Sequence, residues 1–166
     1  MNHIERTLIL IKPDGVQRGL IGRILQRFED AGFKIVGMKL ALASKERALK
    51  HYTEDITMRR GEHVRNQLVD LITKGPVLAF VLEGVNAIEN VRKIVGSTEP
   101  KAAQPGTIRG DFAHISYAYA DAKNIVVKNL IHASSSKEDA ENEIKVWFEP
   151  NELHSYRTVH DIHILE

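Results

Sequence analysis

The sequence is organised around the segment STEPKAAQPGTIRGDF, residues 97–112. Two prolines and three glycines lie between Gly96 and Gly110, so neither a continuous helix nor a central strand can form there. We therefore predict a shaped loop that presents Thr98, Lys101 and Arg109. Two cations and a hydroxyl suit an anion, and phosphate chemistry is the first interpretation.

A second segment, NLIHAS at residues 129–134, follows after one strand-like run. It supplies His132, and only small residues occupy positions 133–136, just before a helix start. An imidazole placed there has space around it and the N-terminus of a helix close by. The segment therefore predicts a reactive histidine near the anion-binding loop.

Length and composition limit the possible classes. With 166 residues, the chain is expected to form one domain, residues 1–166, that buries a core without disulfides or structural metals. The absence of cysteine excludes disulfides, zinc-thiolate sites and cysteine nucleophiles, and nothing points to an oxidising compartment. With 23 basic and 22 acidic residues, the chain lacks the charged field of a protein that binds nucleic acid or a membrane surface.

The apolar pattern predicts a sheet covered by helices. Residues 7–11 form an apolar run that is too short for a signal peptide or a membrane span, and we expect a cytoplasmic protein. This run and a second one at 77–82 are typical of central strands covered on both faces. A third strand is predicted at 33–43, and helices at 21–28, 44–52, 62–73 and 86–95. The alternation favours an α/β or α+β fold, and periodicity alone leaves the direction of the strands open.

The remaining elements lie on either side of the histidine segment. Strand-like pieces at 115–118 and 125–127, separated by a turn at 121–124, predict a hairpin within about residues 113–128. Ser135 and Glu138 fit a capping box that opens a last helix, which Pro150 ends.

Neither of the common glycine-rich phosphate loops occurs, so a phosphate site must be built from side chains. Lys12 follows the first strand, at the sheet edge where ligands collect in open α/β proteins, although a lysine at a strand end can also snorkel to solvent. Arg92 is expected at the edge of the apolar stripe of its helix, and a solvated rim arginine is the alternative.

Glu143 lies at the margin of the apolar face of the last helix, where an unpaired carboxylate is costly. A bond to His132, directly or through Ser134, would fix the histidine tautomer and orient its other nitrogen as a nucleophile, whereas a rim lysine is the alternative partner. Because His154, His160 and His163 do not form a ligand pattern, no metal-binding residues are predicted. We assign His51 and His63 to helix surfaces.

Several motifs together resemble one enzyme family. They are TLILIKPDGVQRGL at 7–20, GPV at 75–77, Arg92 with Gly96 and Thr98, PGTIRGDF at 105–112 and NLIH at 129–132. In this order they closely resemble nucleoside diphosphate kinase, and the likeness extends to Trp147 and Phe148.

The resemblance implies a ferredoxin-like α+β domain, a four-stranded antiparallel sheet covered by helices, assembled as a homohexamer or a tetramer. The implied reaction moves the γ-phosphoryl group of a nucleoside triphosphate to a nucleoside diphosphate, with Mg²⁺, broad base tolerance and a phosphohistidine intermediate. By motif, His132 matches the nucleophile, and Ser134, Glu143 and Tyr52 match its neighbours. The nucleotide-binding residues implied are Lys12, Arg92, Thr98, Arg109 and Asn129.

Three features depart from the family pattern. The segment between Tyr52 and Gly75 is longer and lacks the base-stacking phenylalanine, with His63 or Val64 nearest its position. Extra residues lie between Phe112 and Asn129, and Ser135 replaces an aspartate near the phosphates, which bears on Mg²⁺ binding. A nucleotide-binding oligomer with little turnover is therefore a second hypothesis, and the complete set of phosphate-site residues favours the enzyme.

Overall fold

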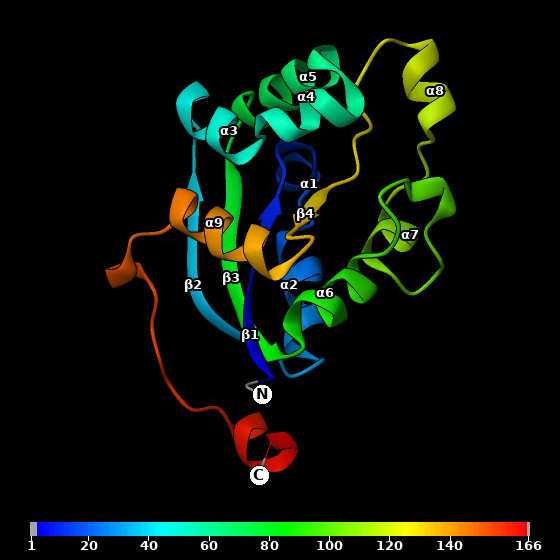
Figure 1. The fold of residues 1–166 in the computed structure, drawn as a ribbon. Helices are drawn as coiled ribbons and strands as arrows, with labels where there is room; N and C mark the ends of the chain where they lie inside the picture. The colour runs from blue at the N-terminus through cyan, green and yellow to red at the C-terminus, as the bar shows by residue number, and fades with distance from the viewer. Residues whose placement is uncertain (1–2, 166) are drawn as a thin grey trace.

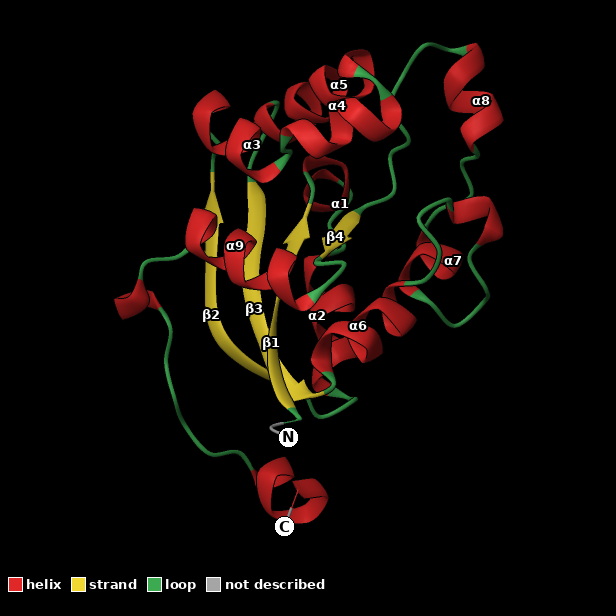
Figure 2. Ribbon diagram, viewed as in Figure 1, coloured by secondary structure: helices red, strands yellow, loops and turns green. Residues whose placement is uncertain are grey.

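The computed structural model describes residues 3–165, and a four-stranded sheet lies at its centre (Figures 1 and 2). The strands are β1 (Ile4–Ile11), β2 (Lys34–Ala41), β3 (Val77–Val85) and β4 (Ile131–Ala133). Their order is β2-β3-β1-β4, and every neighbouring pair is antiparallel. This arrangement confirms the ferredoxin-like α+β class.

The central strands are buried on both faces, as their unbroken apolar runs predict. Ile9, Ile11 and Phe80 pack against α2 (Ile21–Glu29) and α6 (Ala87–Val95). On the other face, Leu8, Leu10 and Val81 pack against α3 (Lys45–His51), α5 (Glu62–Thr73) and α9 (Lys137–Trp147). Figure 1 shows α9 in front of the sheet and α2 behind it, so helices cover both sides.

Several segments between the main elements form short helices, which lie at the top and right of Figure 1. The predicted loop at 97–112 contains a 3₁₀ turn, η1 (Pro100–Ala102), and the single-turn α7 (Ile108–Phe112). Helix α1 (Pro13–Gln17) follows β1 directly, and α4 (Glu54–Arg60) precedes α5. These pieces frame one end of the sheet.

The predicted hairpin at 113–128 is wrong. The segment has no strand and instead forms helix α8 (Tyr117–Ala122). The Ser116 hydroxyl caps the helix by accepting a hydrogen bond from the Tyr119 amide, and Ile125 N–H bonds Ala120 O at its end. Tyr117 and Tyr119 mimic the period of a strand, but three alanines and a cap stabilise the helix.

The cap of α9 is one residue later than predicted. The Ser136 hydroxyl accepts a hydrogen bond of 3.0 Å from the Asp139 amide, whereas the Ser135 hydroxyl contacts the Asp139 carboxylate. Beyond α9, the turn η2 (Pro150–Glu152) leads to a C-terminal π-helical turn, η3 (Asp161–Leu165). Within the described part of the chain, no helix has the length and apolar character needed to cross a membrane.

Candidate active site

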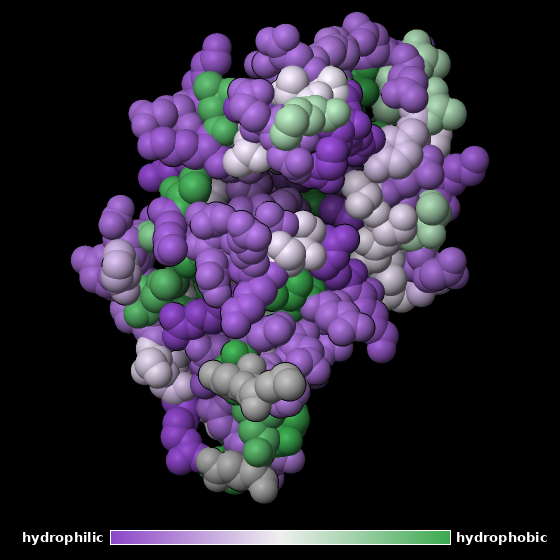
Figure 3. Space-filling view, viewed as in Figure 1, coloured by the Kyte–Doolittle hydropathy of each residue, from purple (hydrophilic) through white to green (hydrophobic). Residues whose placement is uncertain are grey.

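A cleft of about 600 Å³ opens between α3–α5, α9, the loop after α6 and the segment that carries α8. Figure 3 shows this mostly hydrophilic face of the molecule, hollowed between the upper helices and α9. The volume is in the range of small-molecule sites. The cleft brings together most of the predicted site residues, namely Lys12, Tyr52, Arg92, Thr98, Arg109, Asn129, His132 and Glu143. Ser134 is buried and contacts Glu143.

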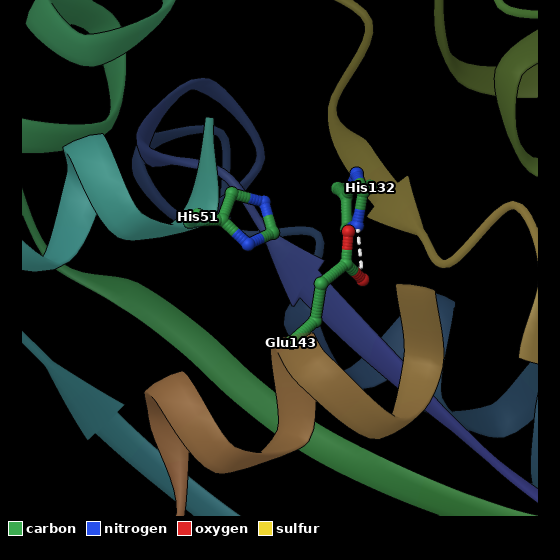
Figure 4. A group of neighbouring side chains, drawn as sticks. All are labelled: His51, His132 and Glu143. Atoms are coloured by element: carbon green, nitrogen blue, oxygen red, sulfur yellow. Dashed lines mark hydrogen bonds and ion pairs between the residues drawn. The ribbon is translucent and has the colours of Figure 1, made fainter. Parts of the chain in front are cut away.

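His132 is held by the carboxylate of Glu143. Nε2 of the imidazole lies 2.9 Å from Glu143 Oε2, and the Ser134 hydroxyl donates to the same oxygen at 2.6 Å (Figure 4). A carboxylate oxygen only accepts, so the proton of this bond belongs to His132 Nε2. The imidazole therefore presents an unprotonated Nδ1 when it is neutral, and both partners predicted for Glu143 are confirmed.

A strained turn places His132 at the start of β4. Leu130 has a φ of +72°, and Ile131 N–H bonds Asn129 O at 2.8 Å, which closes a three-residue turn. Such a backbone is costly for a leucine and persists only where its surroundings hold it. Asp14 Oδ2 accepts the Leu130 amide at 3.0 Å, and Lys12 N–H bonds Leu130 O at 2.8 Å.

Asp14 was not among the predicted site residues. Its place in the KPDG turn directly after the first strand could have indicated a role at this sheet edge. The glycine that follows has a steric role. A Cβ at Gly15 would lie 2.7 Å from Ile11 Cγ2 and 3.1 Å from Leu130 O. Helix α1 can therefore approach the strained turn closely only with glycine at this position.

Lys12 is buried in the cleft, with 5% of its surface exposed, which excludes a snorkelling side chain. Its Nζ donates a 2.7 Å hydrogen bond to Asn129 Oδ1, and Asn129 Nδ2 donates to Thr98 O at 2.8 Å. Burial, together with the nearby charge of Arg109, lowers the pKa of Lys12 to about 8. The amide of Asn129 thus links the end of β1 to the loop after α6.

Arg109 has a structural role that its motif does not show. Its guanidinium donates to Asn129 O at 3.2 Å, Gly96 O at 3.0 Å and Ile131 O at 2.6 Å. Burial and the charge of Arg92 lower the pKa of Arg109 to about 10. Arg92 itself is exposed on the cleft wall, so its expected position at the edge of the core is wrong.

His51 was expected on a helix surface and is instead buried, with 5% of its surface exposed. Trp147 Nε1–H donates to its Nδ1 at 3.3 Å, and its ring meets the His132 ring edge-on at 4.5 Å between centroids. Burial and the neighbouring His132 hold the pKa of His51 well below its usual value. Ala48, three residues earlier in α3, is also buried. The spacing of three residues between this apolar residue and His51, which places both on one helix face, is the sequence signal that could have revealed the burial of His51.

Tyr52 follows His51 and is also buried, and burial raises the pKa of its phenol. Within the described residues, its hydroxyl and His51 Nε2 have no hydrogen-bond partner. His51, His132 and Glu143 offer ligand atoms within 4.8 Å of one another (Figure 4). However, the Trp147 N–H requires a bare Nδ1 on His51, which places the proton of the neutral ring on Nε2 and disfavours metal binding there.

Comparison with known proteins agrees with this geometry. The family model described as nucleoside diphosphate kinase matches residues 5–153. The chain belongs to the nucleoside diphosphate kinase family. The relative from Borreliella burgdorferi is 48% identical over 155 residues, 93% of either chain. The relative from Pyrococcus furiosus is 51% identical over 156 residues, 94% of this chain and 90% of the relative.

Solved structures of nucleoside diphosphate kinases are also similar. A transition state mimic of the Borrelia burgdorferi enzyme, with bound vanadate and ADP, superposes with a TM-score of 0.96 at 45% identity and covers 98% of both chains. The Pyrobaculum aerophilum enzyme gives 0.85 at 36% identity, covering 92% of this chain and all of that one. The chain is therefore an enzyme that transfers a phosphoryl group between nucleoside triphosphates and diphosphates, as the sequence predicts.

Proposed function

We propose that this enzyme works by a ping-pong mechanism through a phosphohistidine at Nδ1 of His132. The observation that carries the proposal is the 2.9 Å bond between His132 Nε2 and Glu143, which fixes the proton on one nitrogen. The lone pair of Nδ1 attacks the γ-phosphorus, and the bond from that phosphorus to the bridging oxygen breaks. The nucleoside diphosphate leaves, and the acceptor diphosphate then attacks the phosphohistidine in the reverse sense.

The charged residues of the cleft would bind the phosphates. Phosphoryl transfer requires mainly in-line positioning and neutralisation of charge. Lys12, Arg92 and Arg109 supply the positive charge, and the Thr98 hydroxyl supplies a further donor. We assign Asn129 to the sugar and phosphate end and Tyr52 to the wall beside the nucleophile. The vanadate and ADP held by the Borrelia enzyme, 45% identical in sequence, support a nucleotide in this cleft.

The proposed reaction uses Mg²⁺, which binds oxygen ligands and neutralises the charge of the β- and γ-phosphates. The donors in the cleft fit such an ion. Ser135 replaces the family aspartate, but its hydroxyl contacts the Asp139 carboxylate, so carboxylate oxygens still line this part of the cleft. We propose that Ser135 and Asp139 face the ion, directly or through water, while the nucleotide supplies the phosphate oxygens.

The partners proposed are nucleoside di- and triphosphates of any base, since the residues above contact phosphate and sugar. We also propose assembly as a homohexamer, with a tetramer as the alternative. Edge strand β2 supports an assembly because Met38, Leu40 and the following Leu42 expose half or more of their surface. The cytoplasm is the compartment we propose, in keeping with a chain that has no cysteine.

A labelling experiment tests the mechanism. The pure protein is incubated with γ-labelled ATP and Mg²⁺, isolated, tested for acid lability of the label and chased with GDP. An acid-labile label that moves to GDP is expected in the wild type, and none in His132→Ala. A wild-type protein that turns over without taking up label, or a fully active His132→Ala variant, would overturn the phosphohistidine mechanism.

A further inference from the structure

The segment that carries α8 docks onto α4 and α5 through a small set of side chains. His63 Nε2 donates a 2.8 Å hydrogen bond to Asn124 Oδ1, and Gln67 Nε2 donates to Asn124 O at 2.9 Å. The Arg60 guanidinium lies 5.0 Å from the centre of the Tyr117 ring. The two elements are thus joined at Asn124, whose φ of +51° ends the turn after α8.

The other contacts of the segment lie elsewhere. Tyr117 N–H bonds Glu99 Oε1 at 2.8 Å, and Lys101 N–H bonds Ile115 O at 3.2 Å. These bonds tie the start of the segment to the loop after α6. The hydrogen bonds at Asn124 therefore hold the second half of the segment against α5.

This docking brings two aliphatic walls together in the cleft. Val64 and Leu68 of α5 form one wall, and Ile125 and Val126 of the inserted segment form the other. Ile125 is 38% exposed, an apolar surface open to a ligand. Aliphatic side chains that line a cleft suit the flat apolar faces of a nucleobase, and the family's stacking phenylalanine is missing from α5.

We propose that His63 and Asn124 form a clasp that fixes the spacing of these two walls and so positions the nucleoside end of the substrate. The inference rests on the proposed function, because it takes the same cleft as the nucleotide site. The clasp acts through the two walls and makes no hydrogen bond to the edge of the base, so its effect on affinity is the same for all four bases. His63 and Asn124 are positioning residues, and the chemistry at His132 does not involve them.

The expected effect of breaking the clasp is on affinity. Losing one hydrogen bond loosens the second wall, and we expect the KM for nucleoside diphosphates to rise about 3- to 10-fold. The turnover number should stay within about twofold of the wild type, because the residues that bind phosphate remain in place. Ribose 5-triphosphate, which has no base, should phosphorylate the enzyme equally well in wild type and variants.

The variants can be matched closely. Asn124→Gly keeps the left-handed backbone and the bond from Gln67, His63→Ala removes the donor, and Asn124→Asp keeps an acceptor and should restore the KM. Lys123→Ala, an exposed neighbour outside the cleft, is the control. Effects in His63→Ala and Asn124→Gly that fail to add in the double variant would show that the two residues act together.

Kinetic and binding measurements distinguish a failure of the clasp from a failure of the proposed function. Titration calorimetry with ADP measures nucleoside binding without turnover. A wild type that binds ADP but transfers no phosphoryl group defeats the proposed function alone. Unchanged ADP affinity in both Asn124→Gly and His63→Ala defeats the clasp alone, as does an equal loss of activity with ribose 5-triphosphate, which would make the segment a support of the whole site.

Discussion

Glu143 Oε2 lies 2.9 Å from Nε2 of His132 and 2.6 Å from the Ser134 hydroxyl. One carboxylate oxygen thus holds two donors, and neither donor can turn away without losing a charge-assisted bond. The imidazole is oriented by this pair before substrate arrives. Strand β4 carries His132 and helix α9 carries Glu143, and Ser134 lies in the short connection at 134–136 that joins them.

Replacing Glu143 by alanine should lower the rate of phosphoenzyme formation about 10- to 100-fold, since a hydrogen bond to a charged group contributes about 1.5–3 kcal/mol. Rapid-quench labelling with γ-labelled ATP measures this rate. Ser134→Ala removes only the second donor and should cost less. Equal rates in wild type and Glu143→Ala would mean that the carboxylate does not orient the nucleophile.

The lowered pKa of Lys12 predicts that activity declines at alkaline pH. Its pKa of about 8 means that the ammonium loses its proton above that pH, so kcat/KM of the free enzyme should fall as pH rises through 8. A bound polyphosphate favours the charged form, so the corresponding limb in kcat should lie at higher pH. Lys12→Met should lower kcat/KM and remove this limb, and a limb that persists in Lys12→Met would assign it to another group.

The sequence predicted the elements whose environment is uniform along their length. The runs at 7–11 and 77–82 are buried on both faces, and α2 carries one continuous apolar stripe, so their patterns match their surroundings. Lys12 could likewise be predicted from its place at the end of a strand, Glu143 from the margin of an apolar stripe, and His132 from the small residues that follow it before a helix start.

The features that were mispredicted depend on contacts between distant segments. The pattern of residues 115–127 fits a hairpin, and the docking of Asn124 on His63, 61 residues away along the chain, adds to the local Ser116 cap in favouring helix α8. The burial of His51 depends on Trp147, 96 residues away along the chain. Local pattern carries no information about either contact, which is why tertiary structure decided both.

The strained turn at Leu130 predicts a role for Asp14. Asp14→Ala removes the acceptor of the Leu130 amide and leaves a buried N–H unpaired, which should lower the free energy of unfolding by about 1–3 kcal/mol. Phosphoenzyme formation should fall as well, because the turn aims His132. Urea unfolding and labelling measure the two effects. Asp14→Asn retains an acceptor and should lose less, and a stable, fully active Asp14→Ala variant would contradict this role.

Arg109 should prove indispensable for the shape of the site as well as for its charge. Its guanidinium bonds three carbonyls in two segments, Gly96 O before the loop and Asn129 O and Ile131 O around the strained turn. A lysine keeps the charge but cannot bridge all three, because its ammonium is a single point. Arg109→Lys should therefore lower the free energy of unfolding by about 2–4 kcal/mol, an estimate for the loss of two or three buried bonds.

The same substitution should speed amide hydrogen exchange at residues 96–98 and 129–131, and these segments are the place to measure it. Arg92→Lys is the matched control, since Arg92 is exposed on the cleft wall and the same substitution there keeps the charge without loosening the loop. If Arg109→Lys changed neither the exchange rates nor kcat/KM by more than Arg92→Lys does, Arg109 would act through its charge alone. Faster exchange confined to Arg109→Lys would instead establish the guanidinium as the link between loop and nucleophile.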